Sequence, residues 1–153
     1  MAKRIEPTGF TLVELVAVIA ILGILSAVVA PRFFDRNVFD SRGFYDQVIA
    51  SLRYAQKVAV AEHRNVCVAF TPNSVALTQV AGGAACPGTA PGNNLANPAN
   101  GTPYRVSSSN ASLSGYGNFS FNALGQPSAA QTITVSGYAA TPIRVEAETG
   151  YVH

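Results

Sequence analysis

The stretch that decides the fold lies near the amino terminus and reads Phe10-Thr-Leu-Val-Glu14-Leu-Val-Ala-Val-Ile-Ala-Ile-Leu-Gly-Ile-Leu-Ser-Ala-Val-Val-Ala30. Glu14 is the single charged side chain among these 21 residues. As an α-helix the stretch would be about 31 Å long, which matches a hydrocarbon core of about 30 Å. It therefore predicts a membrane-spanning helix, which we place at residues 10–31 because Pro31 follows directly.

Two other interpretations of this stretch compete with a functional membrane helix. Val28-Val29-Ala30 resembles the cleavage site of a secretory signal peptide, but the apolar run is longer than the usual ~7–15 residues. A simple single-span anchor accounts for the length and leaves Glu14 unexplained, because a carboxylate within a span is costly and usually functional. Glu14 would lie in the first helical turn, where the helix dipole and headgroup water favour it. Pro31 either kinks the helix or ends it at the membrane edge.

The residues around the start of the apolar run resemble a known processing site. Gly9-Phe10-Thr11-Leu12-Val13-Glu14-Leu15 is similar to the sequence at which type IV prepilins and the pseudopilins of type II secretion are processed. The resemblance implies that a prepilin peptidase cuts between Gly9 and Phe10 and methylates the new amino group of Phe10. Residues 1–9, with Lys3 and Arg4, would then be a cleaved leader.

The same resemblance gives Glu14 a role in assembly. A buried carboxylate needs a partner, and the family account pairs Glu14 with the amine of Phe10 on a neighbouring subunit. Many of these proteins also carry a proline where Pro31 lies. The implied partners are other pilin or pseudopilin subunits, the prepilin peptidase and an inner-membrane assembly platform. The implied location is the bacterial inner membrane, with a single span and a periplasmic carboxy-terminal domain, followed by a pilus or pseudopilus.

Residues 32–64 predict an amphipathic continuation of the helix. One apolar stripe follows the helical period and consists of Phe44, Val48, Leu52, Ala55 and Ala59. Gly43, preceded by Asp40 and Ser41, indicates a possible break with a fresh helix cap. The stripe requires a cover, for which a sheet from the rest of the chain is the obvious candidate.

Residues 65–153 predict a periplasmic β-rich region, because the apolar period changes to two after Arg64. We expect turns at Pro72-Asn73 and 123–127 and a long loop at 82–101. The expected strands are residues 66–70, 75–78, 104–107, 119–122, 132–135 and 143–147. The fold class is therefore α+β and pilin-like, with one long amino-terminal helix packed on an antiparallel sheet.

The two cysteines, Cys67 and Cys86, both fall in this region. An even number of cysteines in an exported domain predicts a disulfide. The alternative is two unrelated thiols, one of them buried in a strand.

The arrangement of a helix followed only by strands resembles the GspH/FimT-type minor pilins and pseudopilins. Leu52-Arg-Tyr-Ala-Gln-Lys57-Val-Ala and Val145-Glu-Ala-Glu-Thr149-Gly150-Tyr151 look nearer still to the MshC-like pilins of the mannose-sensitive haemagglutinin (MSHA) type of pilus. The resemblance implies a structural subunit of a type IV pilus or of a type II secretion filament.

The sequence shows no pattern typical of an enzyme or of a cofactor or metal site. It contains no glycine-rich phosphate loop, no paired-histidine motif and no Cys-x-x-Cys. Without the leader, 8 basic residues face 7 acidic ones, and no basic run indicates nucleic acid as a partner. A DNA-binding minor pilin remains an alternative because several basic residues fall partly on one helical side or on strands, namely Arg53, Lys57, Arg64, Arg105 and Arg144.

Overall fold

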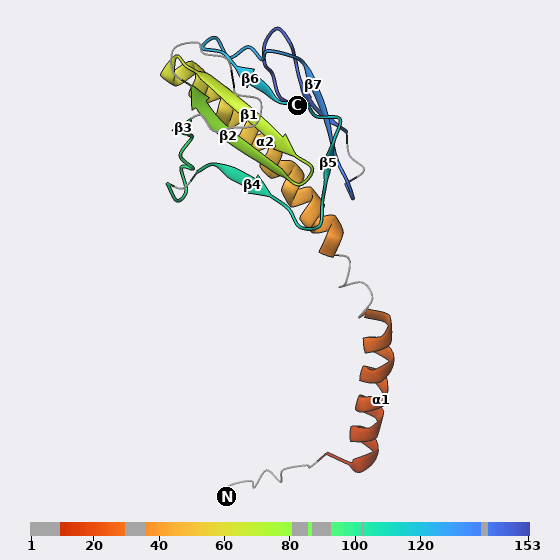
Figure 1. The fold of residues 1–153 in the computed structure, drawn as a ribbon. Helices are drawn as coiled ribbons and strands as arrows, with labels where there is room; N and C mark the ends of the chain where they lie inside the picture. The colour runs from red at the N-terminus through yellow and green to blue at the C-terminus, as the bar shows by residue number, and fades with distance from the viewer. Residues whose placement is uncertain (1–9, 30–35, 81–85, 87–92, 102, 139–140) are drawn as a thin grey trace, which may run out of the picture. The chain divides into compact units, whose positions relative to one another are not determined.

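The computed structural model describes residues 10–29, 36–80, 86, 93–101, 103–138 and 141–153. The chain forms two compact units, Met1–Arg36 and Asn37–His153 (Figure 1). The expected leader, Pro31 and the join between the two helices fall outside the described residues. The predictions of a kink at Pro31 and of one continuous helix therefore stay predictions.

The first unit contains helix α1, Leu12–Val29. Its residues favour a helix because leucine and alanine have high helix propensity and no glycine or proline other than Gly23 interrupts them. Large apolar side chains lie on all of its sides and are exposed within this unit. Among the described residues, no helix combines the length and apolar character needed to cross a membrane. The span over residues 10–31 includes two residues outside the described part and stays a prediction.

The second unit is built around helix α2, Arg36–Glu62. The predicted stripe is confirmed, because Phe44, Val48, Leu52, Ala55 and Ala59 are all buried. The possible break near Gly43 is wrong, since α2 runs through this position without a cap. A single glycine costs a helix only about 1 kcal/mol, and Ser41 is buried in the unit instead of capping a helix end.

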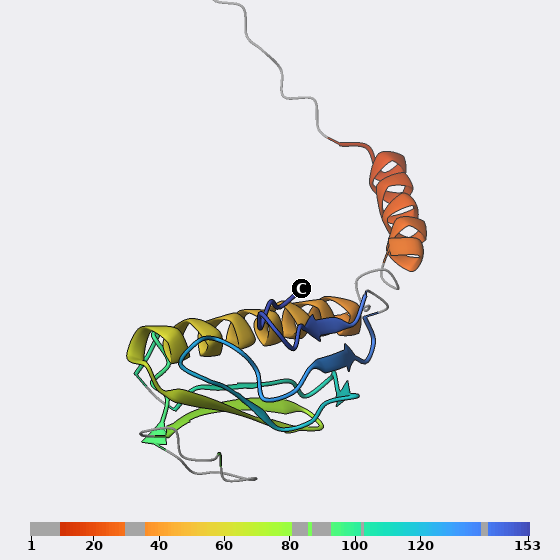
Figure 2. The same cartoon turned by 90° about the horizontal axis from the view of Figure 1, so that it is seen from above.

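Two antiparallel sheets complete the second unit, which confirms the α+β class. The larger sheet has the order β3-β2-β1-β6, and β4 also pairs with β2. Its strands are β1 Asn65–Thr71, β2 Ser74–Val80, β3 Asn93–Asn94, β4 Arg105–Ser107 and β6 Phe119–Phe121. The smaller sheet has the order β5-β7-β8, with β5 Leu113–Ser114, β7 Gln131–Val135 and β8 Ile143–Val145. Figures 1 and 2 show α2 lying along one face of the larger sheet.

The six predicted strands are present with ends shifted by one or two residues, whereas β3 and β5 were not predicted. β3 lies within the expected 82–101 loop. The part of this loop that follows β3 contacts α2. The Tyr54 hydroxyl donates to the carbonyl of Ala96 at 3.2 Å, and the Tyr54 ring stacks on Tyr104 with 5.1 Å between centroids. Burial, followed by the neighbouring Tyr54, raises the pKa of Tyr104. Residues 81–85 and 87–92 of the loop lie outside the described residues.

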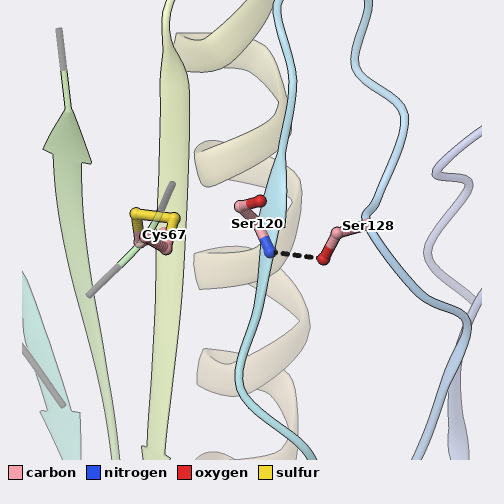
Figure 3. Close-up of a disulfide and its surroundings, with 4 residues drawn as sticks. Cys67, Ser120 and Ser128 are labelled. Carbon is pink, nitrogen blue, oxygen red and sulfur yellow. Dashed lines mark hydrogen bonds between the residues drawn. A yellow bond between two sulfur atoms is a disulfide. The ribbon is translucent and has the colours of Figure 1, made fainter. Parts of the chain in front are cut away.

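Cys67 and Cys86 form a disulfide with 5.6 Å between their Cα atoms, as the even cysteine count predicted. Side chains alternate between the two faces of a strand, and the buried Val66 and Val68 belong to the core under α2. Cys67 therefore lies on the opposite face of β1. Figure 3 shows the disulfide on this face, with α2 behind the sheet. In the ladder, Cys67 pairs with Thr78 on one side and Ser120 on the other.

α2 ends in a hydrogen-bonded reversal of the chain. His63 has a φ of 50°, and the Arg64 amide donates to the carbonyl of Ala59 at 3.2 Å. This is the bond of a Schellman motif, in which the residue after the helix adopts the left-handed conformation. Glycine usually takes this position, because other residues pay a steric cost there. The reversal allows β1 to return along α2, which places Val66 and Val68 over the stripe.

We predict that replacing both cysteines by alanine lowers the free energy of unfolding by about 3 kcal/mol, because the open chain gains loop-closure entropy. Chemical denaturation of the full chain in detergent, followed by tyrosine fluorescence, measures this difference. Wild-type protein reduced with dithiothreitol is the matched control and should lose the same amount. Equal stability of oxidised and reduced wild type would contradict the prediction.

We also predict that His63→Gly raises the free energy of unfolding by about 1 kcal/mol, because it removes the strain of a side chain in the left-handed region. Glu62→Gly, one residue earlier, is the control. That glycine stands in the helix, where it should lower stability by about 1 kcal/mol. The same denaturation experiment compares them, and a loss of stability in both variants would argue against the helix end described here.

Candidate functional site

The start of α1 is organised by Thr11. The Glu14 amide donates to Thr11 Oγ1 at 3.2 Å, and the Leu15 amide donates to the Thr11 carbonyl at 3.1 Å. Thr11 is therefore the N-cap, and Glu14 occupies the third helical position. This is the side-chain-to-backbone half of a capping box, whose signature is Thr-x-x-Glu. The sequence interpretation overlooked this role of Thr11, although the spacing signals it.

The charges at this helix end favour Glu14 and leave its carboxylate exposed. Unpaired amide groups give a helix amino terminus a partial positive charge, which attracts an acidic side chain in the first turn. Within the first unit Glu14 is exposed, and 79% of Phe10 is accessible to solvent. Both residues therefore remain available for contacts with another chain. A helix that is apolar on all sides, as α1 is, requires apolar surroundings.

The predicted site residues fall into separate parts of the molecule. Phe10 and Glu14 lie at the start of α1, and Gly9 and Pro31 lie outside the described residues. Cys67 and Cys86 are joined in the second unit. Among the described residues, no group of three or more histidine, cysteine or acidic side chains is arranged to hold a metal ion.

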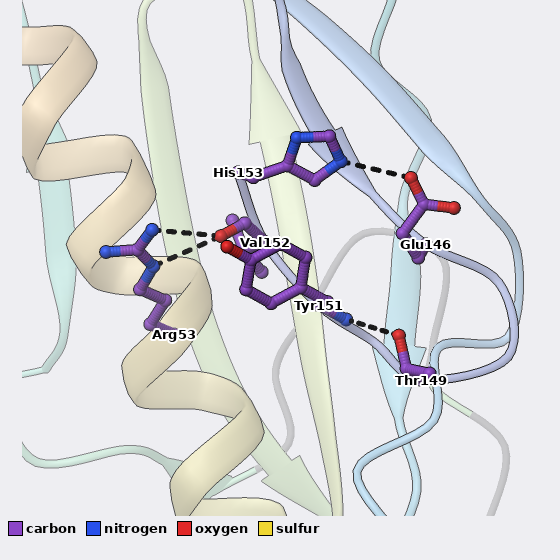
Figure 4. Close-up of polar contacts among 6 residues, drawn as sticks. All are labelled: Arg53, Glu146, Thr149, Tyr151, Val152 and His153. Carbon is purple, nitrogen blue, oxygen red and sulfur yellow. Dashed lines mark hydrogen bonds and ion pairs between the residues drawn. The ribbon is translucent and has the colours of Figure 1, made fainter.

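Polar side chains of α2 hold the carboxy-terminal part of the second unit. Arg53 donates to the Val152 carbonyl from Nε at 3.2 Å and from Nη2 at 3.0 Å, as Figure 4 shows. Gln56 Nε2 donates to the carbonyls of Gly125 and Thr149, both at 3.0 Å. These contacts attach two turns to the helix. The sequence interpretation missed Gln56 and treated Arg53 only as a candidate for binding DNA.

The end of the chain carries a surface ion pair as well. Glu146 Oε1 lies 3.0 Å from His153 Nε2, and the His153 ring stacks on Tyr151 (Figure 4). Both side chains are exposed, so their contact contributes little to stability. Glu146 thus lies at a solvated edge next to a histidine. The guanidinium of Arg53 already donates its hydrogen bonds to a backbone carbonyl. Neither observation favours catalysis or a DNA-binding face.

Comparison with known proteins gives matches over both units. A family model described as type II transport protein GspH matches residues 45–149, and one described as prokaryotic N-terminal methylation motif matches residues 8–30. The type IV narrow pilus major component PilA5 of Thermus thermophilus is 38% identical over 58 residues. That alignment covers 38% of this chain and 50% of PilA5, so the chain spans about half the length of this relative.

Two crystal structures of the type IV minor pilin FimU from Pseudomonas aeruginosa have a similar fold. The TM-scores are 0.50 and 0.51, with 13% and 16% sequence identity. The alignments cover 73% and 79% of this chain and 90% of FimU. This likeness concerns the fold alone, with a helix packed on antiparallel sheets.

The GspH match extends over more than half of the chain, and the methylation motif covers the start of α1. Members of this group are structural proteins that assemble with other pilins and are processed by a prepilin peptidase. The chain belongs to the GspH family of type II transport proteins and carries the prokaryotic N-terminal methylation motif.

Proposed function

We propose that this protein is made as a precursor, cut between Gly9 and Phe10, methylated on Phe10 and assembled into a filament through residues 10–31. Before assembly, the chain resides in the inner membrane with its β-rich unit in the periplasm, and an inner-membrane platform then extracts it. The match of residues 8–30 to the methylation motif supports this proposal. The disulfide supports an oxidising compartment such as the periplasm for the second unit.

The proposed assembly step depends on the charge of Glu14. After cleavage, Phe10 carries a cationic amine, and methylation preserves this charge. The amine and the partial positive charge of the helix end repel each other, whereas the carboxylate is attracted to both. When apolar helices pack side by side, an unpaired carboxylate between them is costly. The amine of a neighbouring subunit removes this cost at one axial position, so the pair sets the register.

The more specific assignment within the class is also a proposal. The Leu52–Ala59 segment and the Val145–Tyr151 segment resemble MshC-like pilins, and we propose that the chain serves an MSHA-type pilus. The same α2 segment supplies Leu52 to the core and Arg53 and Gln56 to the carboxy-terminal turns. The resemblance therefore includes residues that hold the second unit together.

We predict that Glu14→Ala and Glu14→Leu leave membrane insertion intact and abolish incorporation into filaments. Both changes remove the carboxylate that neutralises the neighbouring amine, while α1 keeps its apolar surface. Immunoblots of the membrane fraction and of sheared filaments measure the two steps separately. Glu148→Ala, which removes an exposed acid from the second unit, is the control and should be incorporated normally. Normal incorporation of Glu14→Ala would refute the proposed role.

Mass spectrometry of the mature protein provides a second test of the proposal. The expected amino terminus is methylated Phe10. A native chain that still begins at Met1 in a competent cell, or that begins after Ala30, would overturn the processing step.

A further inference from the structure

The two cysteines of the disulfide lie in different surroundings. Cys67 belongs to β1 and is 4% exposed. Cys86 lies between β2 and β3 and is partly exposed. The bond therefore joins a residue inside the larger sheet to a residue outside the strands. A reagent that arrives from solution reaches its two sulfur atoms unequally.

Neighbouring strands enclose Cys67 on both sides. β1 lies between β2 and β6, and Cys67 pairs with Thr78 of β2 and with Ser120 of β6. Residues directly opposite each other in antiparallel strands point to the same face, with Cβ atoms about 4.5–5.5 Å apart. Thr78 is itself only 4% exposed, and Figure 3 shows Ser120 on the strand beside Cys67. These two side chains form walls around the sulfur of Cys67.

Backbone hydrogen bonds hold both walls in place. The Ser120 amide donates to Ser128 Oγ at 3.1 Å, and the Ser128 amide donates to the Ser120 carbonyl at 2.8 Å (Figure 3). On the other side, all 7 residues of β1 pair with β2. None of these contacts involves Cys86, so the enclosure of Cys67 does not depend on the disulfide.

This enclosure decides how the bond can be opened. Thiol–disulfide exchange begins when a thiolate attacks one sulfur of the bond, and access helps to select that sulfur. An external thiolate that attacks Cys86 Sγ forms a mixed disulfide with Cys86. The bond to Cys67 then breaks, its electron pair stays on Cys67 Sγ, and this sulfur takes up a proton. Attack on Cys67 Sγ would first require the walls to move.

Opening of the bond at Cys86 leaves the core of the second unit in place. Val66 and Val68 pack in the core on the α2 side of β1, whereas Cys67 lies on the opposite face. β1 keeps its pairing with both β2 and β6 when Cys86 is released, because backbone groups make these ladders. The exchange can therefore take place in the folded protein.

We propose that Cys86 is the thiol-exchange site of this protein, at which a thiol–disulfide oxidoreductase forms its mixed disulfide, and that Cys67 is the resolving cysteine. During oxidation, the Cys86 thiolate attacks the disulfide of the oxidoreductase and releases one of its two thiolates. The Cys67 thiolate then attacks Cys86 Sγ and releases the second thiolate. The chain loses two electrons and two protons, and the disulfide of the oxidoreductase becomes a dithiol.

Peptide mapping of the oxidised full chain in detergent tests which sulfur is attacked. The chain is treated with limiting glutathione, quenched with excess N-ethylmaleimide, digested and analysed by mass spectrometry. We expect the product with glutathione on Cys86 and maleimide on Cys67 to exceed the reverse product at least about tenfold, because access selects the sulfur. In concentrated urea, which removes the walls, the two products should form in similar amounts. Thioredoxin whose resolving cysteine is replaced by serine is the second probe and should be linked to Cys86.

Thr78→Ala tests the role of the wall. It should raise the share of glutathione on Cys67, because the smaller side chain opens a path to this sulfur. Thr132→Ala is the matched control, since Thr132 is an exposed threonine of β7, and it should leave the share unchanged. The same share in both variants would overturn the shielding on which the proposal depends.

Other results would overturn the exchange site itself. They are equal amounts of the two products in the folded chain, an excess of the product on Cys67, or an excess on Cys86 that persists in urea. Thioredoxin linked to Cys67, or no link to thioredoxin, would overturn the assignment of Cys86 to an oxidoreductase. None of these results would affect the proposed function, because they concern the disulfide and not the processing of Gly9 and Phe10.

Discussion

The second unit depends on the packing of the α2 stripe against the larger sheet. A helix of this length owes most of its stability in water to tertiary contacts, and Val48, Leu52, Ala55 and Ala59 are fully buried. Arg53 and Gln56 lie beside the stripe. Their side chains donate hydrogen bonds to backbone carbonyls in the carboxy-terminal part of the chain. Core and surface loops are thus positioned by one helix.

α1 presents the opposite case, because under the proposed function its partners lie in other molecules. Its apolar side chains surround the helix, and those whose burial the structure describes, up to Leu25, are exposed within the first unit. Glu14 gives this surface the single charged side chain of α1, next to the N-cap formed by Thr11. A uniform apolar helix can slide along its neighbours with little change in energy, whereas one carboxylate that must meet one amine selects a position. The chain therefore combines a helix covered by its own sheet with a helix that we propose other subunits cover.

Much of this organisation could be predicted from residue patterns, and the failures have physical causes. The stripe of α2 and the six longer strands could be predicted because apolar residues recur at a regular spacing along each element. β3 and β5 were missed because two-residue strands such as Asn93–Asn94 carry no period. The break near Gly43 was wrong because tertiary packing overrides a weak local signal. Gln56 could not be identified, since its two acceptors are 69 and 93 residues away in the chain.

The left-handed turn at His63 also affects the order in which the second unit can fold. It joins α2 directly to the β1–β2 hairpin, so the segment 36–80 forms a layered helix and hairpin from neighbouring parts of the chain. Contacts that are close in sequence form faster, because little loop entropy is lost. We expect this segment to form the folding nucleus and to provide a template for β6, β7 and β8. The α2 stripe would then be shielded while the last third of the chain is still unfolded.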